Sequence, residues 1–193
     1  MDEAADSAVE AKEKDRTVAL IIAILALLLA LAEAGARRAQ HLSTEMNIEA
    51  SDLFNFYQAK KIRSTVAETA AKSLEAQTTA LADPKAREAF EKQIGDFRAI
   101  VARFEKDPKT PEDSLDAIQE RANAAVEARE LANHRLERYE LGSGLAQIAI
   151  VLASAAIITG IGALVWFSAG LGLLGAILLA LGFFAPTALA FLG

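Results

Sequence analysis

The chain contains no cysteine, which excludes disulfide bonds, thiolate metal sites and a cysteine nucleophile. It has only two histidines, and its sequence shows no glycine-rich phosphate loop, no Ser/His/Asp set and no metal-ligand motif. These absences argue against an enzyme and suggest no cofactor. The redox compartment stays undecided, because a chain without cysteine is compatible with either environment.

Charge is also missing, over the whole C-terminal part from Leu141 to Gly193. All 20 Lys and Arg and all 26 Asp and Glu lie upstream, mostly around one apolar run, Val18 to Ala32. Elements of a soluble fold mix polar and apolar residues, because one face of each element meets water. This segregation therefore indicates two solvents. The net charge of −6, without a clustered basic face, argues against nucleic acid as a partner.

Two stretches of the uncharged region, 145–167 and 171–192, are each long enough to cross a bilayer. About 20 apolar residues at about 1.5 Å each span a hydrocarbon core of about 30 Å. Only Ser168, Ala169 and Gly170 lie between them, which predicts a tight hairpin of two transmembrane helices with its turn there. Two buried helices of a soluble protein would need a larger covering shell than this chain provides.

Small residues recur in the hairpin at the spacing that lets helices approach closely in lipid. They are Ala156, Gly160, Gly172, Ala176 and Ala180. Such a stripe either packs the hairpin on itself or forms a seam between subunits, and the sequence leaves both interpretations open.

A third apolar run, 18–36, follows a charged N-terminal tail, 1–17, and predicts transmembrane helix 1. The alternative is a cleaved signal peptide, since basic residues precede a short apolar core and Ala34-Gly35-Ala36 resembles a cleavage site. The tail is also rich in Asp and Glu, which is unusual for a signal peptide. An uncleaved anchor is therefore favoured.

Residues 37–144 show helical periodicity throughout and predict an extramembrane helical domain. Asp83-Pro84 and Thr110-Pro111 each read as an N-cap followed by the first helical residue. Helices are therefore expected at about 43–82, 84–106 and 111–139. The predicted fold class is an all-α membrane protein: three transmembrane helices plus a helical hairpin or coiled-coil-like domain between spans one and two.

Apolar rows on these three helices are expected to form the core of the domain. They are Ile62, Val66, Ala70 and Leu74 on the first; Phe90, Ile94, Phe97, Val101 and Phe104 on the second; and Leu115, Ile118, Ala122, Ala125, Ala132, Leu136 and Tyr139 on the third. At about 1.5 Å per residue the first helix reaches about 60 Å, and the third helix, counted on to Ala146, reaches about 54 Å. This predicts that they form an antiparallel pair, with the second helix across or beside their distal end or packed against a neighbouring subunit.

The same matching of lengths puts His41 and His134 at similar heights, with Glu45 and Glu137 near by. A metal or proton site can be imagined there. Two histidines without a tight spacing motif are more often solvated or core side chains, so both are weak metal candidates.

The stretch from Asn47 to Arg63 combines aromatic and basic residues close to the first span. Its candidate functional side chains are Asp52, Phe54, Phe56, Tyr57, Gln58, Lys60, Lys61 and Arg63. Three interpretations stay open: packing against the third helix, an interface with a subunit or partner, and binding of anionic lipid through the basic residues.

This stretch resembles the signature of an uncharacterised bacterial inner-membrane family, a domain-of-unknown-function group whose members read approximately asD-aromatic-x-aromatic-YQAK-x-IK. The resemblance implies one N-terminal span, a helical middle and a C-terminal two-span hairpin, and it brings no activity with it. Family hairpin turns often carry basic residues, whereas Ser168-Ala169-Gly170 has none. The basic turns of relatives imply a cytoplasmic N-terminus and a periplasmic helical domain.

These features favour a non-enzymatic membrane scaffold or accessory protein that forms a homo-oligomer, belongs to a larger membrane complex, or both. Membrane lipid and protein partners of the helical projection are expected, and no small-molecule substrate is identified. One alternative is an oligomeric channel or transporter lined by glycines, Ser154, Thr159 and Thr187. The other is a membrane-coupled sensor, although the short tail 1–17 offers no output domain.

Overall fold

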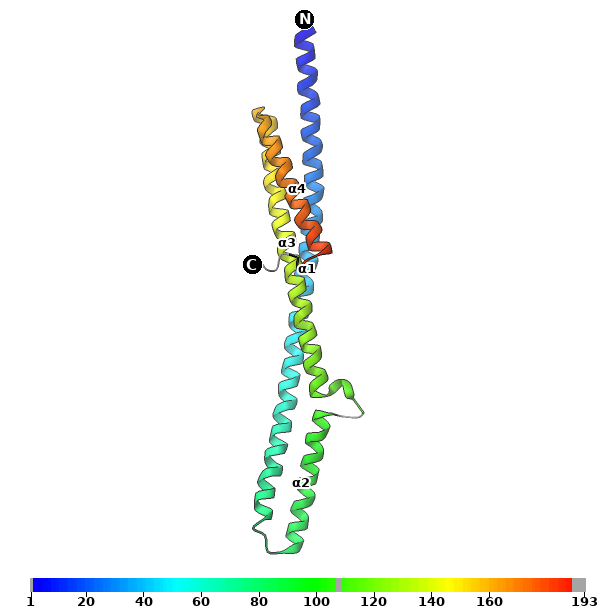
Figure 1. Cartoon of the computed structure of the whole chain (residues 1–193), viewed down its shortest axis with the longest axis vertical. Coiled ribbons are helices and arrows are strands. Elements are labelled where there is room, and N and C mark those ends of the chain that lie inside the picture. Colours follow the sequence, from blue (N-terminus) through cyan, green and yellow to red (C-terminus); the bar gives the residue numbers. More distant parts are fainter. Residues whose placement is uncertain (1, 107–108, 189–193) are drawn as a thin grey trace. The chain divides into compact units, whose positions relative to one another are not determined.

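The computed structural model describes residues 2–106 and 109–188, with side chains described from residue 15 onward. These residues form four α-helices, α1 (Asp2–Thr78), α2 (Pro84–Glu105), α3 (Leu115–Thr159) and α4 (Gly162–Phe184), and one 3-10 turn, η1 (Pro111–Asp113) (Figure 1). By length and composition, α1, α3 and α4 can each cross a membrane. The prediction of an all-α chain with three candidate membrane helices is confirmed.

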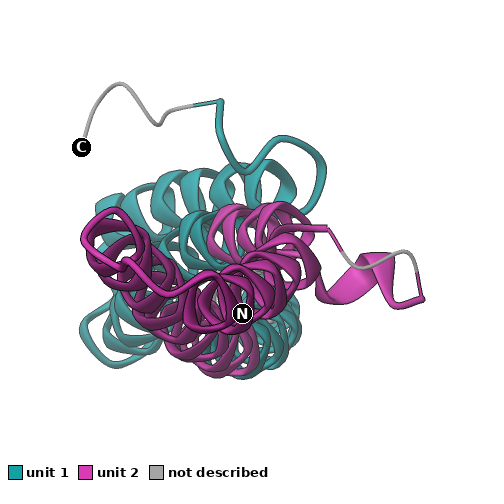
Figure 2. Cartoon of the chain, turned by 90° about the horizontal axis from the view of Figure 1, so that it is seen from below, with its two compact units in different colours: residues 1–44, 129–193 teal, residues 45–128 magenta. Residues whose placement is uncertain are grey.

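The chain divides into two compact units (Figure 2). Unit 1 comprises Met1–Thr44 and Arg129–Gly193, and unit 2 comprises Glu45–Ala128. The described part of the predicted tail 1–17, the predicted span 18–36 and most of the predicted helix 43–82 belong to one helix, α1, which ends at Thr78; no proline interrupts the chain before Pro84. In the same way α3 joins most of the predicted helix 111–139 to most of the predicted span 145–167.

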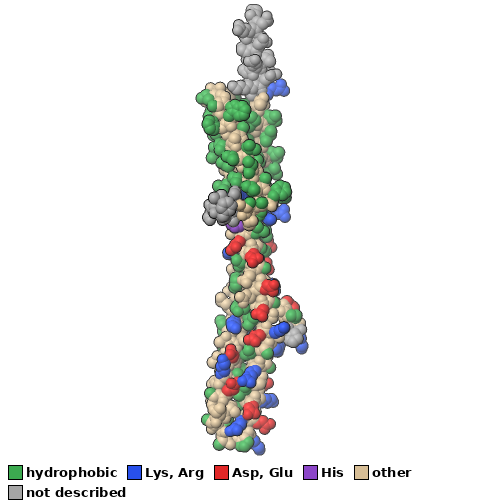
Figure 3. Space-filling model, in the orientation of Figure 1, with side chains coloured by type: hydrophobic (Ala, Val, Ile, Leu, Met, Phe, Trp, Pro, Cys, Tyr) green, Lys and Arg blue, Asp and Glu red, His purple; other side chains and the backbone are tan. Residues whose placement is uncertain are grey.

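Unit 1 buries small side chains and exposes large apolar ones. Ala32, Ala146, Ala149 and Ala153 are fully buried between the helices. The exposed apolar side chains include Leu20, Ile24, Leu27, Leu31, Val151, Ile158, Trp166, Phe167 and Leu173. Hydrophobic side chains cover the visible face of these spans (Figure 3). A water-soluble bundle would place the large apolar residues inside, so this arrangement suits helices surrounded by lipid.

Helices α3 and α4 approach each other at a pair of glycines. A Cβ atom built on Gly175 would lie 3.0 Å from the carbonyl oxygen of Gly142, and one built on Gly142 would lie 3.1 Å from that of Gly175. Farther along the same contact, the hydroxyl of Ser168 donates a hydrogen bond to the carbonyl of Ala149 at 2.8 Å. The two backbones are therefore close enough that any larger side chain at either glycine must push them apart.

Helix α1 fits against the hairpin through two further contacts. A Cβ atom on Gly172 of α4 would collide with Cδ2 of Leu25. The ring of Tyr139 on α3 lies 3.0 Å from a Cβ built on Gly35 of α1 and 2.8 Å from one built on Gly182 of α4. Tyr139 thus contacts both neighbouring helices. The segment Ala34-Gly35-Ala36, considered above as a cleavage site, lies inside a continuous packed helix.

The turn of the hairpin lies at Gly160–Ile161, so the predicted turn at Ser168-Ala169-Gly170 is wrong. Gly160 has φ +71°, a left-handed conformation that glycine adopts without steric cost. Ser168 is fully buried inside α4, where its hydrogen bond to Ala149 makes a polar side chain tolerable. The C-terminal end of the predicted span 171–192 lies outside the described residues.

Replacement of Gly160 by alanine is expected to destabilise the hairpin by about 1–2 kcal/mol, because a Cβ atom is unfavourable at this φ. Steric crowding would not contribute, since nothing lies within 4 Å of the added atom. Thermal unfolding in detergent measures the loss. Gly144→Ala, in a helix and equally uncrowded, is the control, and an equal response of the two variants would contradict the explanation.

In unit 2, α2 folds back onto the end of α1. The Asp83 carboxylate accepts a hydrogen bond from the Lys85 amide at 3.0 Å, as the Asp-Pro pair predicts. Arg98 of α2 then contacts Glu75 of α1 at 2.7 Å. Because α2 occupies this end of α1, the predicted pairing of 43–82 with 111–139 over their full length is wrong. The expectation that the second helix lies beside the distal end agrees with these contacts.

Helix α3 starts later than the Thr110-Pro111 pair suggests. Residues Pro111–Asp113 form only the turn η1, and Ser114 then caps α3 by accepting a hydrogen bond from the Ala117 amide at 3.3 Å. The apolar rows predicted for the second and third helices face inward: Ile94, Leu115, Ile118, Ala122, Ala125, Ala132 and Tyr139 are buried and the remaining members are half-buried.

Candidate functional site

The aromatic and basic stretch of α1 lies in unit 2, and helix geometry divides it between two faces. Leu53 is buried and Tyr57 half-buried, and both pack with Ile118 and Ala122 of α3. These contacts support the packing interpretation for the inward residues only. The outward residues are Asp52, Phe54, Phe56, Gln58, Lys61 and Arg63, all of them exposed.

Lys60 joins this stretch to the start of α3. Its ammonium donates a hydrogen bond to the carbonyl oxygen of Asp113, at the end of η1. The same nitrogen lies 5.4 Å from the centre of the Phe56 ring, within the range of a cation–π contact. Lys60 is therefore half-buried and engaged within the unit, which leaves Lys61 and Arg63 as the exposed cations of the stretch.

Large apolar side chains remain uncovered on the outer face of α1. Phe54 and Phe56 are 37% and 43% exposed, and Ile62 and Val66 are 63% and 64% exposed. The predicted core row is therefore wrong at Ile62 and Val66, whereas its other members, Ala70 and Leu74, are half-buried. The inward row of α1 consists of Ala50, Leu53, Tyr57, Lys60, Ser64, Ala67, Ala71 and Leu74.

This inward row alternates spacings of three and four residues, as the seam of a coiled coil does. Its signal is weak in the sequence, because alanine, serine and lysine occupy most of the positions. A search for large apolar residues selects Ile62 and Val66 instead. The periodicity of Ala50, Ser64, Ala67 and Ala71 could have revealed the buried face.

An exposed ion pair lies on α1 within unit 2. Glu68 and Lys72 lie 2.6 Å apart on α1, and the hydrogen bond between them lowers the pKa of Glu68 and raises the pKa of Lys72. The contribution of Glu68 is present at neutral pH and disappears as the pH falls through its lowered pKa. Both side chains are exposed, so this pair contributes little to stability.

The histidines lie in unit 1 without a shared ligand set. His41 borders a shallow groove together with Ala36, Arg37, Gln40, Thr44, Leu136 and Glu140. His134 has its Nδ1 atom 3.9 Å from a carboxylate oxygen of Glu137, on its own helix. Within residues 15–106 and 109–188, whose side chains the structure describes, no three His, Asp or Glu side chains gather at metal-binding distance.

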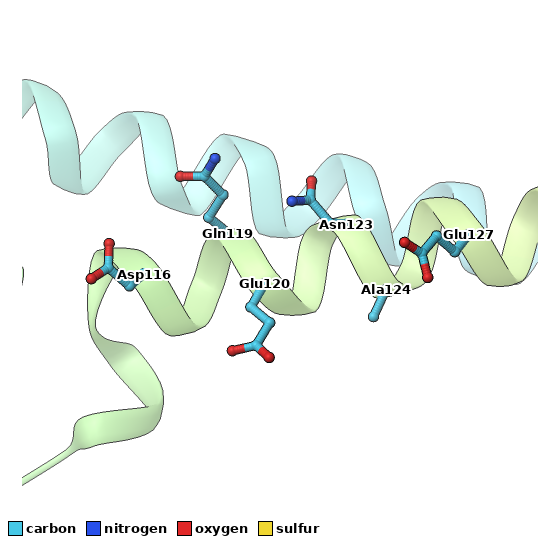
Figure 4. A pocket seen from close by; sticks show the side chains of 6 residues that line it. All are labelled: Asp116, Gln119, Glu120, Asn123, Ala124 and Glu127. Carbon is cyan, nitrogen blue, oxygen red and sulfur yellow. The ribbon is translucent and has the colours of Figure 1, made fainter.

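An open groove of about 490 Å³ follows the outer side of α3. Its lining residues are Asp116, Gln119, Glu120, Asn123, Ala124 and Glu127, and Figure 4 shows these side chains in a row along one helix. Because all of them come from a single helix, they do not converge on a common point. The groove therefore lacks the geometry of a catalytic or ligand-binding pocket.

The small residues of the hairpin have different environments. Ala156 is buried, Gly172 contacts Leu25, and Ala176 and Ala180 are half-buried. Gly160 differs from its predicted packing role, because it forms the turn and is exposed. Gly142 and Gly175, which bring the backbones of α3 and α4 close together, were not singled out by the small-residue spacing.

Comparison with known proteins adds a family and no activity. No curated protein and no solved structure matches the chain. The model of one family, a domain of unknown function designated DUF4337, matches residues 14–185, which include all three candidate membrane helices. The match covers the aromatic and basic stretch as well as the hairpin. The chain therefore belongs to the DUF4337 family.

Proposed function

We propose that this protein is a non-enzymatic membrane scaffold, oligomeric or part of a larger complex, whose unit 2 binds protein partners through the outer face of α1. The observation that carries the proposal is the exposure of Phe54, Phe56, Ile62 and Val66 on a helix segment rich in charged neighbours. Exposed large apolar side chains among polar ones are typical of interaction surfaces.

The residue types on this face suit a protein partner. Aromatic and Arg side chains dominate the energetics of protein interfaces, and Phe54, Phe56 and Arg63 are all accessible on α1. Lipid headgroups would be bound mainly through clustered cations. Lys60 is already engaged with Asp113 and Phe56, which weakens that alternative.

The polar side chains of the spans give less support to a channel. The hydroxyl groups of Ser154, Thr159 and Ser168 donate hydrogen bonds to the backbone carbonyls of Ile150, Ala155 and Ala149. These bonds satisfy the hydroxyl donors within the protein. They favour a role in helix structure and packing over the lining of a pore.

We also propose the bacterial inner membrane as the location, with the N-terminus in the cytoplasm and unit 2 in the periplasm. The support is the resemblance of the Asn47–Arg63 stretch to the family signature. Labelling with an impermeant thiol reagent tests it, because the chain has no cysteine of its own. A single cysteine at exposed Ala124 should react in intact spheroplasts, and protection there would reverse the proposed orientation.

The double substitution Phe54→Ser and Phe56→Ser is expected to lower the amount of co-purifying partner at least about tenfold, because aromatic anchors commonly contribute about 2 kcal/mol each. Purification of the full chain in a gentle detergent, followed by native mass measurement and identification of bound proteins, is the test. Ile100→Ser, which removes another exposed apolar side chain of unit 2, is the matched control. Unchanged partner recovery with the double variant would contradict the proposed binding surface.

A further inference from the structure

One face of α1 in unit 2 is both exposed and free of charge. Its centre is a row of six side chains with alternating spacings of four and three residues, which we name the α1 seam. The α1 seam consists of Asn55, Ala59, Ile62, Val66, Thr69 and Ser73, and all six are exposed. The charged residues of the same helix segment lie to either side of this row or on the inward face. Asp52, one turn before Asn55, marks the end of the seam.

Burying the α1 seam away from water costs little desolvation free energy. Ile62 and Val66 at its centre are 63% and 64% exposed, so burial would gain a hydrophobic contribution. The hydroxyl of Thr69 already donates to the carbonyl of Thr65 at 2.8 Å, so its donor stays satisfied on burial. Ala59 and Ser73 are small enough to let another helix come close.

The absence of charge indicates what kind of partner fits. Copies of one chain anchored in one bilayer by the same spans share their orientation, so their α1 helices run parallel. In a parallel two-fold contact every residue faces its own counterpart. A charge in the row would then face a like charge and repel it, whereas a different protein is normally selected through complementary charges. An uncharged row suits self-association.

The spacing of the α1 seam residues also favours a second copy of this chain as the partner. Positions four and three residues apart form the seam of parallel coiled coils, with β-branched side chains common at one of the two position types. Ile62 and Thr69 occupy positions of this β-branched type, and Asn55 occupies the equivalent position one heptad before Ile62. A single asparagine there fixes the register of parallel helices by bonding to its counterpart.

We propose that the α1 seam binds the α1 seam of a second copy of this chain, as a parallel and in-register helix pair. This inference rests on the proposed scaffold function and names one of its partners. The seam is short, about 27 Å at about 1.5 Å per residue, so its own affinity is modest. Anchoring in a shared membrane raises the effective concentration and favours the pair there.

Disulfide crosslinking in native membranes tests the register, since the natural chain has no cysteine. Single cysteines replace Ala59, Ile62 or Val66 in the full chain, and an oxidant is then added. Each variant is expected to give a product of twice the 20.5 kDa chain mass. The yield should exceed that of the control Lys61→Cys, also exposed but on the flank of the helix, at least about tenfold.

A second set of variants tests whether the contact depends on the seam. Ile62→Lys is expected to reduce crosslinking of the Val66→Cys reporter at least about tenfold, because it places two ammonium groups opposite each other. Ile100→Lys on α2 should leave the yield unchanged. Equal yields at Lys61→Cys and Ile62→Cys, absence of the doubled mass, or an adduct of another mass would each overturn the proposal. Partner recovery in detergent, measured separately, shows whether the scaffold function survives that outcome.

Discussion

Replacement of Gly175 by leucine is expected to separate α3 from α4 and to destabilise the membrane hairpin by about 3 kcal/mol or more. A Cβ atom at this position lies 3.0 Å from the carbonyl oxygen of Gly142, and the rest of the leucine side chain adds further overlap. Overpacking a close contact costs about 1–3 kcal/mol when side chains can adjust. Here the obstacle is backbone within a helix, which adjusts less.

Thermal unfolding in detergent, followed through the fluorescence of Trp166, the chain's one tryptophan, measures this effect. Gly170→Leu is the matched control, because it makes the same replacement in α4 at a site with nothing within 4 Å. Both variants gain the same helix propensity. The difference between them therefore reports the contact with Gly142. A Gly175→Leu variant as stable as the control would show that α3 and α4 do not approach closely there.

Replacement of Ile118 by alanine is expected to destabilise unit 2 by about 3 kcal/mol. Ile118 is fully buried and packs with Leu53 of α1 and Ala122 of α3. Removing a buried Ile side chain loses its transfer free energy and leaves a cavity, at a total cost of about 2–5 kcal/mol. Small neighbours such as Ala122 cannot fill the space, which favours the middle of that range.

Hydrogen exchange of the full chain in detergent measures this change locally. Faster exchange is expected in the α1 and α3 amides around the Leu53 cluster, with the hairpin amides of unit 1 unchanged. Ile100→Ala removes the same atoms from a 40% exposed position and should have a much smaller effect. Equal acceleration in both variants would mean that Ile118 does not lie in a packed core.

These two substitutions concern different kinds of packing. In unit 1 the contacts depend on residues small enough for backbones to meet, such as Gly142, Gly175 and Ala149. In unit 2 they depend on a few large side chains inserted between helices, such as Leu53 and Ile118. Water favours the second kind through the hydrophobic effect, whereas helices in lipid associate mainly through close fit.

The candidate site was only partly visible in the sequence. The stretch around Phe54 and Phe56 was recognised, because aromatic residues are followed there by basic ones in a pattern that resembles a family signature. The sequence did not reveal that this stretch is divided between an inward face with Tyr57 and Lys60 and an outward face with Ile62. Ile62 and Val66 were expected in the core because they share one face of the helix with Ala70 and Leu74. That expectation overlooked the heptad spacing of small residues such as Ala67.

The sequence by itself determined the helical class and the three candidate membrane helices, since periodicity and the uncharged stretch after Leu141 depend only on local composition. It also determined the start of α2, because an Asp-Pro pair caps a helix without help from distant residues. Only the tertiary structure decided the turn at Gly160, the face of α1 that is buried and the sharing of α1 between α2 and α3. Each of these depends on which surfaces meet, and that choice depends on contacts between residues far apart in the chain.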